Sequence, residues 1–198
     1  MDQNGDRSRP PTRLKGAEPE ASEPELPPGL DGGLELDIVR DAGDWTSFEP
    51  AETTIERVLQ AAARHPRVAT SRQSSRPKSV CIALTSDAAV RELNRSWRAK
   101  DTPTNVLSFP SPDPPADLET AGPLFLGDVV LAAETIHREA HEMDLTPHHH
   151  LQHLVVHGLL HLLGFDHEGE AEATDMETLE TEILASIGVA DPYARSDR

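Results

Sequence analysis

The sequence predicts an α+β fold, in which a single domain has a four-stranded mixed sheet covered by about five helices. Four short segments carry the apolar patterns of β-strands, and five longer segments carry apolar residues at helical spacing. One of those helices is apolar on nearly all sides, which is typical of a helix at the centre of a fold. We therefore expect this helix, which also holds a cluster of histidines, to be the central one.

The four expected strands are short apolar runs. The first alternates apolar and polar residues, as a half-buried strand does, and the second is continuously apolar, as an inner strand is. The third stops at Pro110, and an acidic, proline-rich stretch, interpreted as a mobile loop, separates it from the fourth. The expected strands span 34–39, 79–85, 106–109 and 124–131, and the loop spans 111–122.

The five expected helices are delimited by capping and breaking residues. Pro66 follows the first helix, and Ser86 or Asp87 can cap the second. The fixed backbone angle of Pro147 suits the first position of the fourth helix, and Gly188 ends the fifth. The expected helices span 53–65, 87–97, 132–143, 147–163 and 170–187.

The two ends of the chain are expected to lie outside the folded domain. Residues 1–33 are rich in Pro, Gly, Glu, Asp and Arg and show no apolar periodicity. Such a segment cannot bury enough surface to offset the entropy of ordering it, so we predict a disordered tail. It has no apolar core of a secretory signal. The domain is expected to span 34–190, followed by a C-terminal tail at 191–198.

Composition narrows the classes of partner and compartment. The formal net charge of −17 argues against nonspecific binding of duplex DNA, so an RNA substrate would have to be held by a small local basic patch. No stretch approaches the ~18 apolar residues that a membrane span needs. The single cysteine, Cys81, rules out an internal disulfide and fits a reducing compartment. We expect a cytoplasmic protein with no membrane and no DNA partner.

The most informative motif is His-Gly-Leu-Leu-His-Leu-Leu-Gly-Phe-Asp-His at 157–167. His157 and His161 are four residues apart, so they lie on the same face of a helix. Gly164 can end that helix in a left-handed turn, after which the reversed chain can bring His167 over the same ion. Three neutral nitrogens with an open fourth position form the ligand set of a catalytic zinc. We predict one Zn²⁺ ion bound by His157, His161 and His167.

Other histidines share the four-residue spacing, so periodicity alone allows more than one ligand pair. Only His157 and His161 are followed by a glycine stop and a third histidine within reach. The remaining histidines of this helix are expected to face solvent or to lie behind the ligands. They are His148, His149, His150 and His153.

The histidine motif is similar to the H-E-x-x-H motif of zinc proteases, with one decisive difference. Gly158 stands where those enzymes have the glutamate that serves as general base. Without this glutamate, a protease would lack its central acid–base group. The alternative of a metal-dependent hydrolase of another substrate, such as peptide, is therefore disfavoured but stays open.

A second cluster of interest is basic. Arg91, Arg95, Arg98 and Lys100 form the densest group of positive charges in this acidic chain. The planar fork of arginine matches phosphate oxygens, and an arginine beside a metal could neutralise the charge that develops on an attacked phosphate. We interpret Arg91 and Arg95 as ordinary residues of a solvated helix face.

Three motifs in order resemble the YbeY family of bacterial endoribonucleases. They are Trp-Arg-Ala-Lys-Asp-Thr-Pro-Thr-Asn-Val-Leu-Ser-Phe-Pro at 97–110, Leu-Gly-Asp at 126–128, and the histidine motif at 157–167. The resemblance covers roughly 34–187 and implies a zinc-binding α+β domain that cuts single-stranded RNA. It also implies metal binding by the three histidines of the motif and a catalytic role for Arg98. Trp97 and Phe165 stand where the family usually or often has tyrosine.

The function that the resemblance implies is maturation of ribosomal RNA, at the 3′ end of the small-subunit RNA, together with ribosome quality control. Expected partners are single-stranded RNA, a ribosomal RNA precursor, and small-subunit ribosomal proteins or assembly factors. Asp128 and Asp166 are candidates for groups that orient a ligand imidazole or transfer a proton, and the first role is the commoner one for an aspartate beside a ligand histidine. A second alternative also stays open, in which the protein is a non-catalytic ribosome-assembly factor whose zinc only holds the fold.

Overall fold

A computed structural model describes residues 33–71, 76–112 and 122–194. The expected α+β class is confirmed, because the described residues form one four-stranded mixed sheet and six α-helices. The elements are β1 (Leu34–Arg40), the short 3₁₀ helix η1 (Thr46–Phe48), α1 (Ala51–Arg64), α2 (Pro66–Thr70), β2 (Lys78–Thr85), α3 (Asp87–Arg98), β3 (Val106–Pro110), β4 (Leu124–Ala132), α4 (Ala133–Glu142), α5 (Pro147–Leu162) and α6 (Glu170–Ser186).

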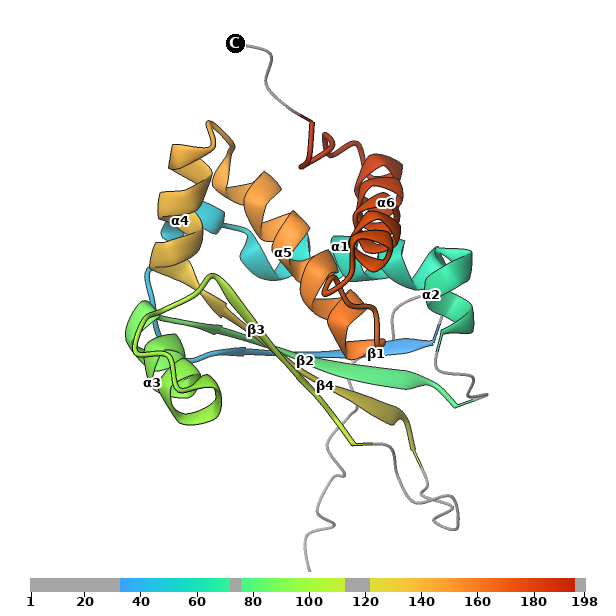
Figure 1. Cartoon of the computed structure of the whole chain (residues 1–198), viewed down its shortest axis with the longest axis horizontal. Coiled ribbons are helices and arrows are strands. Elements are labelled where there is room, and N and C mark those ends of the chain that lie inside the picture. Colours follow the sequence, from blue (N-terminus) through green and yellow to red (C-terminus); the bar gives the residue numbers. More distant parts are fainter. Residues whose placement is uncertain (1–32, 72–75, 113–121, 195–198) are drawn as a thin grey trace, which may run out of the picture.

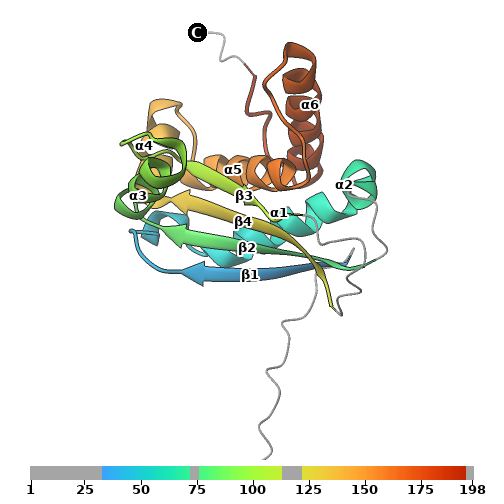
Figure 2. The ribbon, with the colours of Figure 1, turned by 60° about the horizontal axis from the view of Figure 1, so that its bottom comes forward.

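The sheet has the strand order β1-β2-β4-β3. β1, β2 and β4 run parallel, and β3 pairs antiparallel with β4 at the other edge. Figure 2 shows the strands in this order, with β1 at one edge and β3 at the opposite edge. The inner position of β2 agrees with its continuous apolar sequence.

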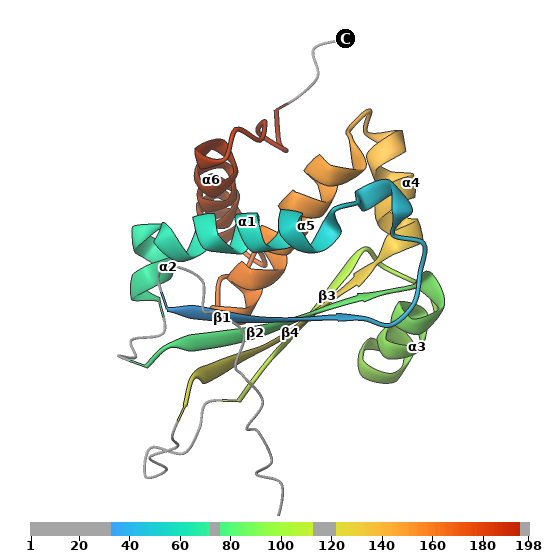
Figure 3. The same ribbon diagram turned by 180° about the vertical axis from the view of Figure 1, so that it is seen from behind.

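The helices lie unevenly about the sheet. Figures 1 and 3 show α1, α4, α5 and α6 gathered on one side, whereas α3 lies apart from them at one end. The large core lies between the sheet and the gathered helices, and a smaller apolar cluster lies between α3 and the sheet. The smaller cluster consists of Val90, Leu107, Val130 and Ala132.

The central helix α5 approaches the sheet closely at Gly158. A Cβ atom on Gly158 would lie 2.6 Å from Cγ1 of Val129, which is fully buried in β4. The hydroxyl of Ser108 in β3 donates a hydrogen bond to the carbonyl oxygen of Gly158 at 3.2 Å. Because successive strand residues face opposite sides, Leu107 faces α3 while Ser108 faces α5. The edge strand β3 therefore lies between the end of α3 and the histidine-bearing helix.

The structure adds two short elements that the sequence did not predict. α2 has five residues, of which only Val68 is buried, and η1 has three. Elements of one turn carry too few residues to show an apolar period, and so six α-helices replace the expected five. The predicted tail at 1–33 lies outside the described residues except for Gly33, as does most of the predicted loop at 111–122. Among the described residues, no helix is long and apolar enough to cross a membrane.

Candidate metal centre

The turn after α5 has the geometry that the sequence predicts. Thr146 caps the start of α5, where its hydroxyl accepts a hydrogen bond from the backbone N–H of His149 at 3.2 Å. At the other end Gly164 takes a φ of +90°, and the N–H of Phe165 donates to the carbonyl oxygen of Leu160 at 3.0 Å. Such a left-handed glycine ends a helix and reverses the chain. The residues that follow are thereby directed back toward the last turns of α5.

The reversal brings the three predicted ligand histidines together. The ring of His167 lies 5.5 Å from that of His157 and 5.0 Å from that of His161, measured between ring centroids. One nitrogen from each of the three imidazoles lies within 4.8 Å of the others. His157 and His161 are half-buried, whereas His167 is exposed on the rim.

The hydrogen bonds of the rings define which nitrogens are free. The N–H at Nδ1 of His161 donates to the carbonyl oxygen of Phe165 at 3.1 Å, because a carbonyl oxygen only accepts. Nδ1 of His157 donates to the carboxylate of Glu180 at 2.9 Å. In neutral rings both Nε2 atoms then carry lone pairs, and these two atoms lie 3.0 Å apart. Two lone pairs at such a short distance repel each other unless they share a cation. These two nitrogens therefore fit the ligand positions of a metal ion.

The lowered pKa of His161 favours metal binding. Burial lowers the pKa of His161, and the neighbouring rings of His157 and His167 lower it further. A lowered pKa keeps the imidazole neutral, which is the form that binds a metal ion.

Glu180 of α6 stands directly behind the ligands. Its side chain is fully buried and accepts hydrogen bonds from Nδ1 of His157 at 2.9 Å, from Nε2 of His153 at 3.1 Å, and from the hydroxyl of Tyr193. Burial alone would raise the pKa of the Glu180 carboxyl, but the three hydrogen bonds outweigh it and hold the pKa at about 2. The carboxylate is therefore ionised, and it fixes the tautomer of His157.

Sequence analysis missed Glu180 and Tyr193. Glu180 had one available signal, because it interrupts the apolar face that α6 forms with Leu179 and Ile183. Tyr193 had no signal, since it lies in the segment predicted as a C-terminal tail at 191–198. His153 lies behind the ligands, as expected, because it donates to Glu180 instead of reaching the cleft.

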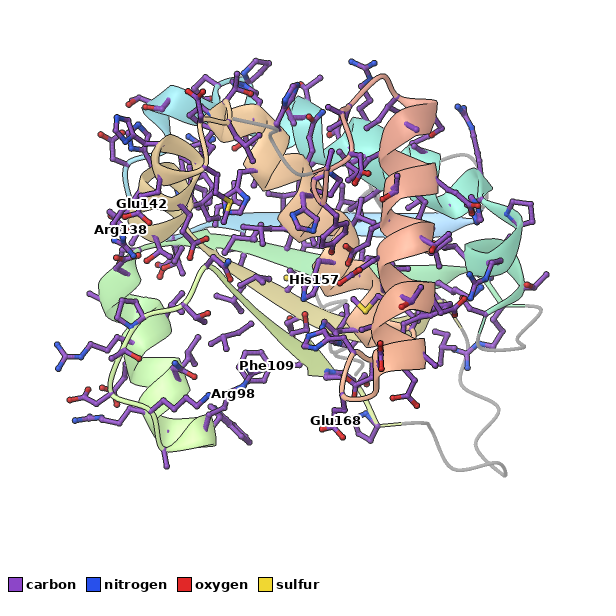
Figure 4. The ribbon with its side chains drawn as sticks, turned by 45° about the horizontal axis from the view of Figure 1, so that its top comes forward. Arg98, Phe109, Arg138, Glu142, His157 and Glu168 are labelled. Atoms are coloured by element: carbon purple, nitrogen blue, oxygen red, sulfur yellow. The ribbon has the colours of Figure 1, made fainter. Side chains whose placement is uncertain are left out.

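The three histidines open onto a cleft of about 570 Å³. Arg98, the last residue of α3, lines the same cleft across β3, together with Ser108 and Asn105. Figure 4 shows Arg98 beside Phe109 on one side of β3 and His157 on the other side. In the part of the chain that the structure describes, Arg98 forms no ion pair, whereas Arg95 pairs with a neighbouring glutamate. The free guanidinium of Arg98 is thus available to an anionic ligand.

The wall of the cleft beside β3 is held by a chain of polar contacts that ends on the buried ring of His150. Nδ2 of Asn105 donates to the carboxylate of Glu139 at 2.8 Å, and Nε2 of His150 donates to the same oxygen at 2.8 Å. His150 is only 3% exposed, so it neither faces solvent nor lies behind the metal ligands as expected. This chain of contacts fixes the segment before β3 to both α4 and α5.

The two predicted aspartates have different positions. Asp166 lines the cleft and lies close enough to His161 for its charge to act on that ring. Asp128, in contrast, lies beside Cys81 of β2 on the sheet face opposite α5, and it does not reach the histidines. A β-bulge causes this: the one residue of β2 between Ser79 and Cys81 lies opposite two residues of β4, Leu126 and Gly127, and Gly127 takes a φ of +132°. The bulge turns Asp128 to the far face.

Together, these features define a class of protein: a metal-binding α+β domain with an arginine-lined cleft suited to an anionic substrate. Comparison with known proteins gives the family. The family model described as endoribonuclease YbeY matches residues 41–188, so the chain belongs to the endoribonuclease YbeY family.

Individual relatives agree with the family match. The chain is 47% identical over 161 residues to the endoribonuclease YbeY of Azorhizobium caulinodans, covering 81% of this chain and 97% of the relative. It is 48% identical over 167 residues to that of Parvibaculum lavamentivorans, covering 81% and 85%. A solution structure of a Thermotoga maritima protein aligns over 81% of this chain and 99% of its own, with 23% identity and a TM-score of 0.44.

Proposed function

We propose that this chain is a cytoplasmic, zinc-dependent endoribonuclease that cleaves single-stranded RNA and matures the 3′ end of small-subunit ribosomal RNA. The observation that carries the proposal is the convergence of three imidazoles and the guanidinium of Arg98 on one cleft, in a chain of the endoribonuclease YbeY family. Family membership supports the RNA-cleaving activity, and the geometry supports the assignment of individual residues.

His157, His161 and His167 are the residues that would hold the ion. When bound there, zinc would supply Lewis acidity toward a phosphoryl oxygen of the RNA backbone. The guanidinium of Arg98 stabilises the negative charge that develops on the phosphate during cleavage. Glu180 holds the ring of His157 in place with its Nε2 directed at the cleft.

Gly158 contributes packing instead of chemistry. Its hydrogen atoms face Val129, and a side chain of any size would displace that strand residue. The position therefore has no room for the glutamate of zinc proteases, and the peptide hydrolase alternative finds no support in the geometry. Asp166 is the carboxylate that lines the cleft nearest His161.

The proposed biological setting is the ribosome. We propose small-subunit ribosomal proteins or assembly factors as partners that deliver the RNA, and a role in ribosome quality control. The proposed endoribonuclease domain extends past residue 190, because Tyr193 contacts Glu180 and belongs to the support of the site. Co-sedimentation of the protein with small-subunit precursors, compared with mature subunits, tests this setting.

Cleavage of an end-labelled, unstructured RNA tests the activity. Zinc-loaded wild type is compared with Arg98→Ala, His157→Ala and the matched control Arg95→Ala, which removes an exposed arginine of the same helix. We expect a loss on the order of 10²–10³ in rate for Arg98→Ala, a loss for His157→Ala, and little change for the control. Product ends distinguish the nucleophile, since a 2′,3′-cyclic phosphate requires the ribose hydroxyl whereas a free 3′-hydroxyl excludes it.

Equal activity in all four proteins would indicate a contaminating nuclease and contradict the proposal. Absence of activity in wild type, combined with loss of stability in a His167→Ala variant, would favour the non-catalytic assembly factor.

A further inference from the structure

Trp97 is the most exposed large apolar side chain among the described residues, with 73% of its surface accessible. The chain has only one other tryptophan, Trp45, which is 2% exposed. A single exposed apolar residue is ordinary on a protein surface. The case for a function of Trp97 therefore depends on what surrounds it.

The indole ring packs against the face of β3 that is opposite to the cleft. Its centroid lies 6.0 Å from that of Phe109, with an angle of 64° between the ring planes. Phe109 stands in β3 between Ser108 and Pro110, both of which line the cleft. Figure 4 shows Phe109 beside Arg98 on the outer side of β3. An RNA strand that leaves the histidines past Arg98 and continues around the edge strand β3 would reach Trp97.

The charges around Trp97 suit a nucleic acid. Arg91 pairs with Asp101 at 2.9 Å and Arg95 pairs with Glu92 at 2.7 Å, so neither is free for an anion. No carboxylate pairs with Arg98 or Lys100 within residues 33–71, 76–112 and 122–194. Two cations without an ion-pair partner among these residues therefore follow Trp97 directly in the sequence.

The backbone under this region is fixed by hydrogen bonds. Nδ2 of the buried Asn94 donates to the carbonyl oxygen of Thr102 at 2.7 Å, and the N–H of Lys100 donates to the carbonyl oxygen of Asn94 at 3.3 Å. Ala99 ends α3 with a φ of +55°. A site built in advance loses little conformational entropy when a ligand binds.

We propose that Trp97 is a stacking platform for one unpaired base of the RNA, with Arg98 and Lys100 binding the phosphates next to that base. Aromatic rings beside cationic side chains are how proteins bind single strands, because every base offers a π-face and the cations hold the backbone. A paired base has both faces covered by its neighbours, so the platform selects single-stranded RNA. The polar and charged surroundings of Trp97 favour RNA over an apolar protein partner, whose binding surface would call for further exposed apolar residues.

The inference rests on the proposed RNA substrate, so its test measures binding without cleavage. The full chain is kept metal-free with a chelator, and its affinity is measured for a short, fluorescein-labelled, unstructured RNA. The same RNA is also prepared with single abasic sites at successive positions, and as a duplex. The variants are Trp97→Ala, Trp97→Phe and the matched control Met143→Ala, which removes an exposed apolar side chain of 56% accessibility.

We expect Trp97→Ala to bind the intact single strand about 5- to 100-fold more weakly, whereas Trp97→Phe and Met143→Ala stay close to wild type. An abasic site at one position of the RNA should weaken its binding to wild type by a similar factor and should not change its binding to Trp97→Ala. Binding of the duplex should not respond to Trp97→Ala. Because Trp45 is buried, quenching of the intrinsic fluorescence by RNA should come from Trp97 and disappear in Trp97→Phe.

Unchanged affinity of Trp97→Ala for the intact strand would overturn the platform. The platform would also be wrong if Trp97→Ala lost the same factor in affinity, relative to wild type, on intact RNA and on every abasic RNA. If wild type cleaves RNA while Trp97→Ala binds normally, the platform is wrong and the endoribonuclease proposal stands. If Trp97 binds a base but wild type cleaves no RNA, the platform stands and the endoribonuclease proposal is wrong. If wild type neither binds nor cleaves RNA, both proposals are wrong, and a protein partner becomes the occupant to seek.

Discussion

Nδ1 of His157 donates a hydrogen bond to Oε1 of Glu180 at 2.9 Å, although the two residues belong to different helices and lie 23 positions apart. The bond has two consequences for the candidate metal centre. It fixes the proton of His157 on Nδ1, which leaves Nε2 directed toward His161. It also places a negative charge behind the ring, and such a charge makes the imidazole a stronger metal ligand.

Replacement of Glu180 should therefore weaken metal binding without removing any ligand. We expect Glu180→Gln to lower zinc affinity by about 10- to 100-fold, because the neutral amide loses the charge while keeping the shape of the side chain. Competition against a chromophoric chelator measures the affinity. Glu177→Gln, at an exposed position of the same helix, is the control and should bind zinc as wild type does. Equal affinities in all three proteins would show that the carboxylate does not tune the site.

Tyr193→Phe should destabilise the protein, because it removes the hydrogen bond from the Tyr193 hydroxyl to the carboxylate of Glu180. The hydroxyl of Tyr193 is one of three donors to a fully buried carboxylate, and its removal leaves that charge less well solvated. We expect a loss of about 1–3 kcal/mol in the free energy of unfolding, measured by denaturant titration of the metal-free protein. The phenylalanine ring can still pack against His153, whose ring lies 5.4 Å from that of Tyr193. A variant as stable as wild type would show that two donors satisfy Glu180.

The sequence predicts those parts of the site that depend on local geometry. The spacing of His157 and His161, the helix stop at Gly164 and the return to His167 all follow from rules that act within eleven residues. The structure brings these three rings together as expected.

What the sequence could not predict depends on packing between distant elements. The contact of Glu180 with His157 arises from the packing of α6 against α5, and no local pattern encodes it. The position of Asp128 depends on a single inserted residue in β4, which reverses the facing of every side chain beyond it. α2 was missed for the opposite reason, since five residues are too few to show a period.

Gly158→Ala should destabilise the protein, although alanine is the better helix former by roughly 0.5–1 kcal/mol. The new methyl group would lie 2.6 Å from Cγ1 of Val129, a branched side chain that is fully buried and has little freedom to rotate. We expect overpacking to dominate and to lower the free energy of unfolding by about 1–3 kcal/mol. Thermal denaturation of the metal-free proteins measures the loss.

The double variant Gly158→Ala/Val129→Ala tests the cause of that loss. Val129→Ala alone creates a cavity, but in the double variant the two changes compensate each other, so their effects should be less than additive. Additive losses would show that Gly158 is required for a reason other than its contact with Val129.

The buried ring of His150 should make stability depend on pH. Burial lowers the pKa of His150 from its ordinary value of 6.5, although the hydrogen bond with Glu139 opposes the shift, and Nδ1 of His150 has no partner among the described residues. Below pH 6.5 the unfolded chain therefore binds a proton at His150 that the folded chain does not. The neutral ring of His150 makes its full contribution to the free energy of unfolding above this pH. As the pH falls from 6.5 toward the pKa of His150 in the folded protein, that free energy decreases by at most about 1.4 kcal/mol per pH unit.

The measurement is the free energy of unfolding of metal-free protein between pH 7.5 and about 5, for wild type, His150→Gln and His149→Gln. The glutamine at 150 can still donate to Glu139 but does not titrate, so this variant should lose less stability on acidification than wild type. His149 is half-buried on the same turn, and its variant should keep the wild-type dependence. The substitution removes the proton uptake of His150. If the free energy of unfolding has the same pH dependence in wild type and His150→Gln, the acid sensitivity therefore belongs to other groups.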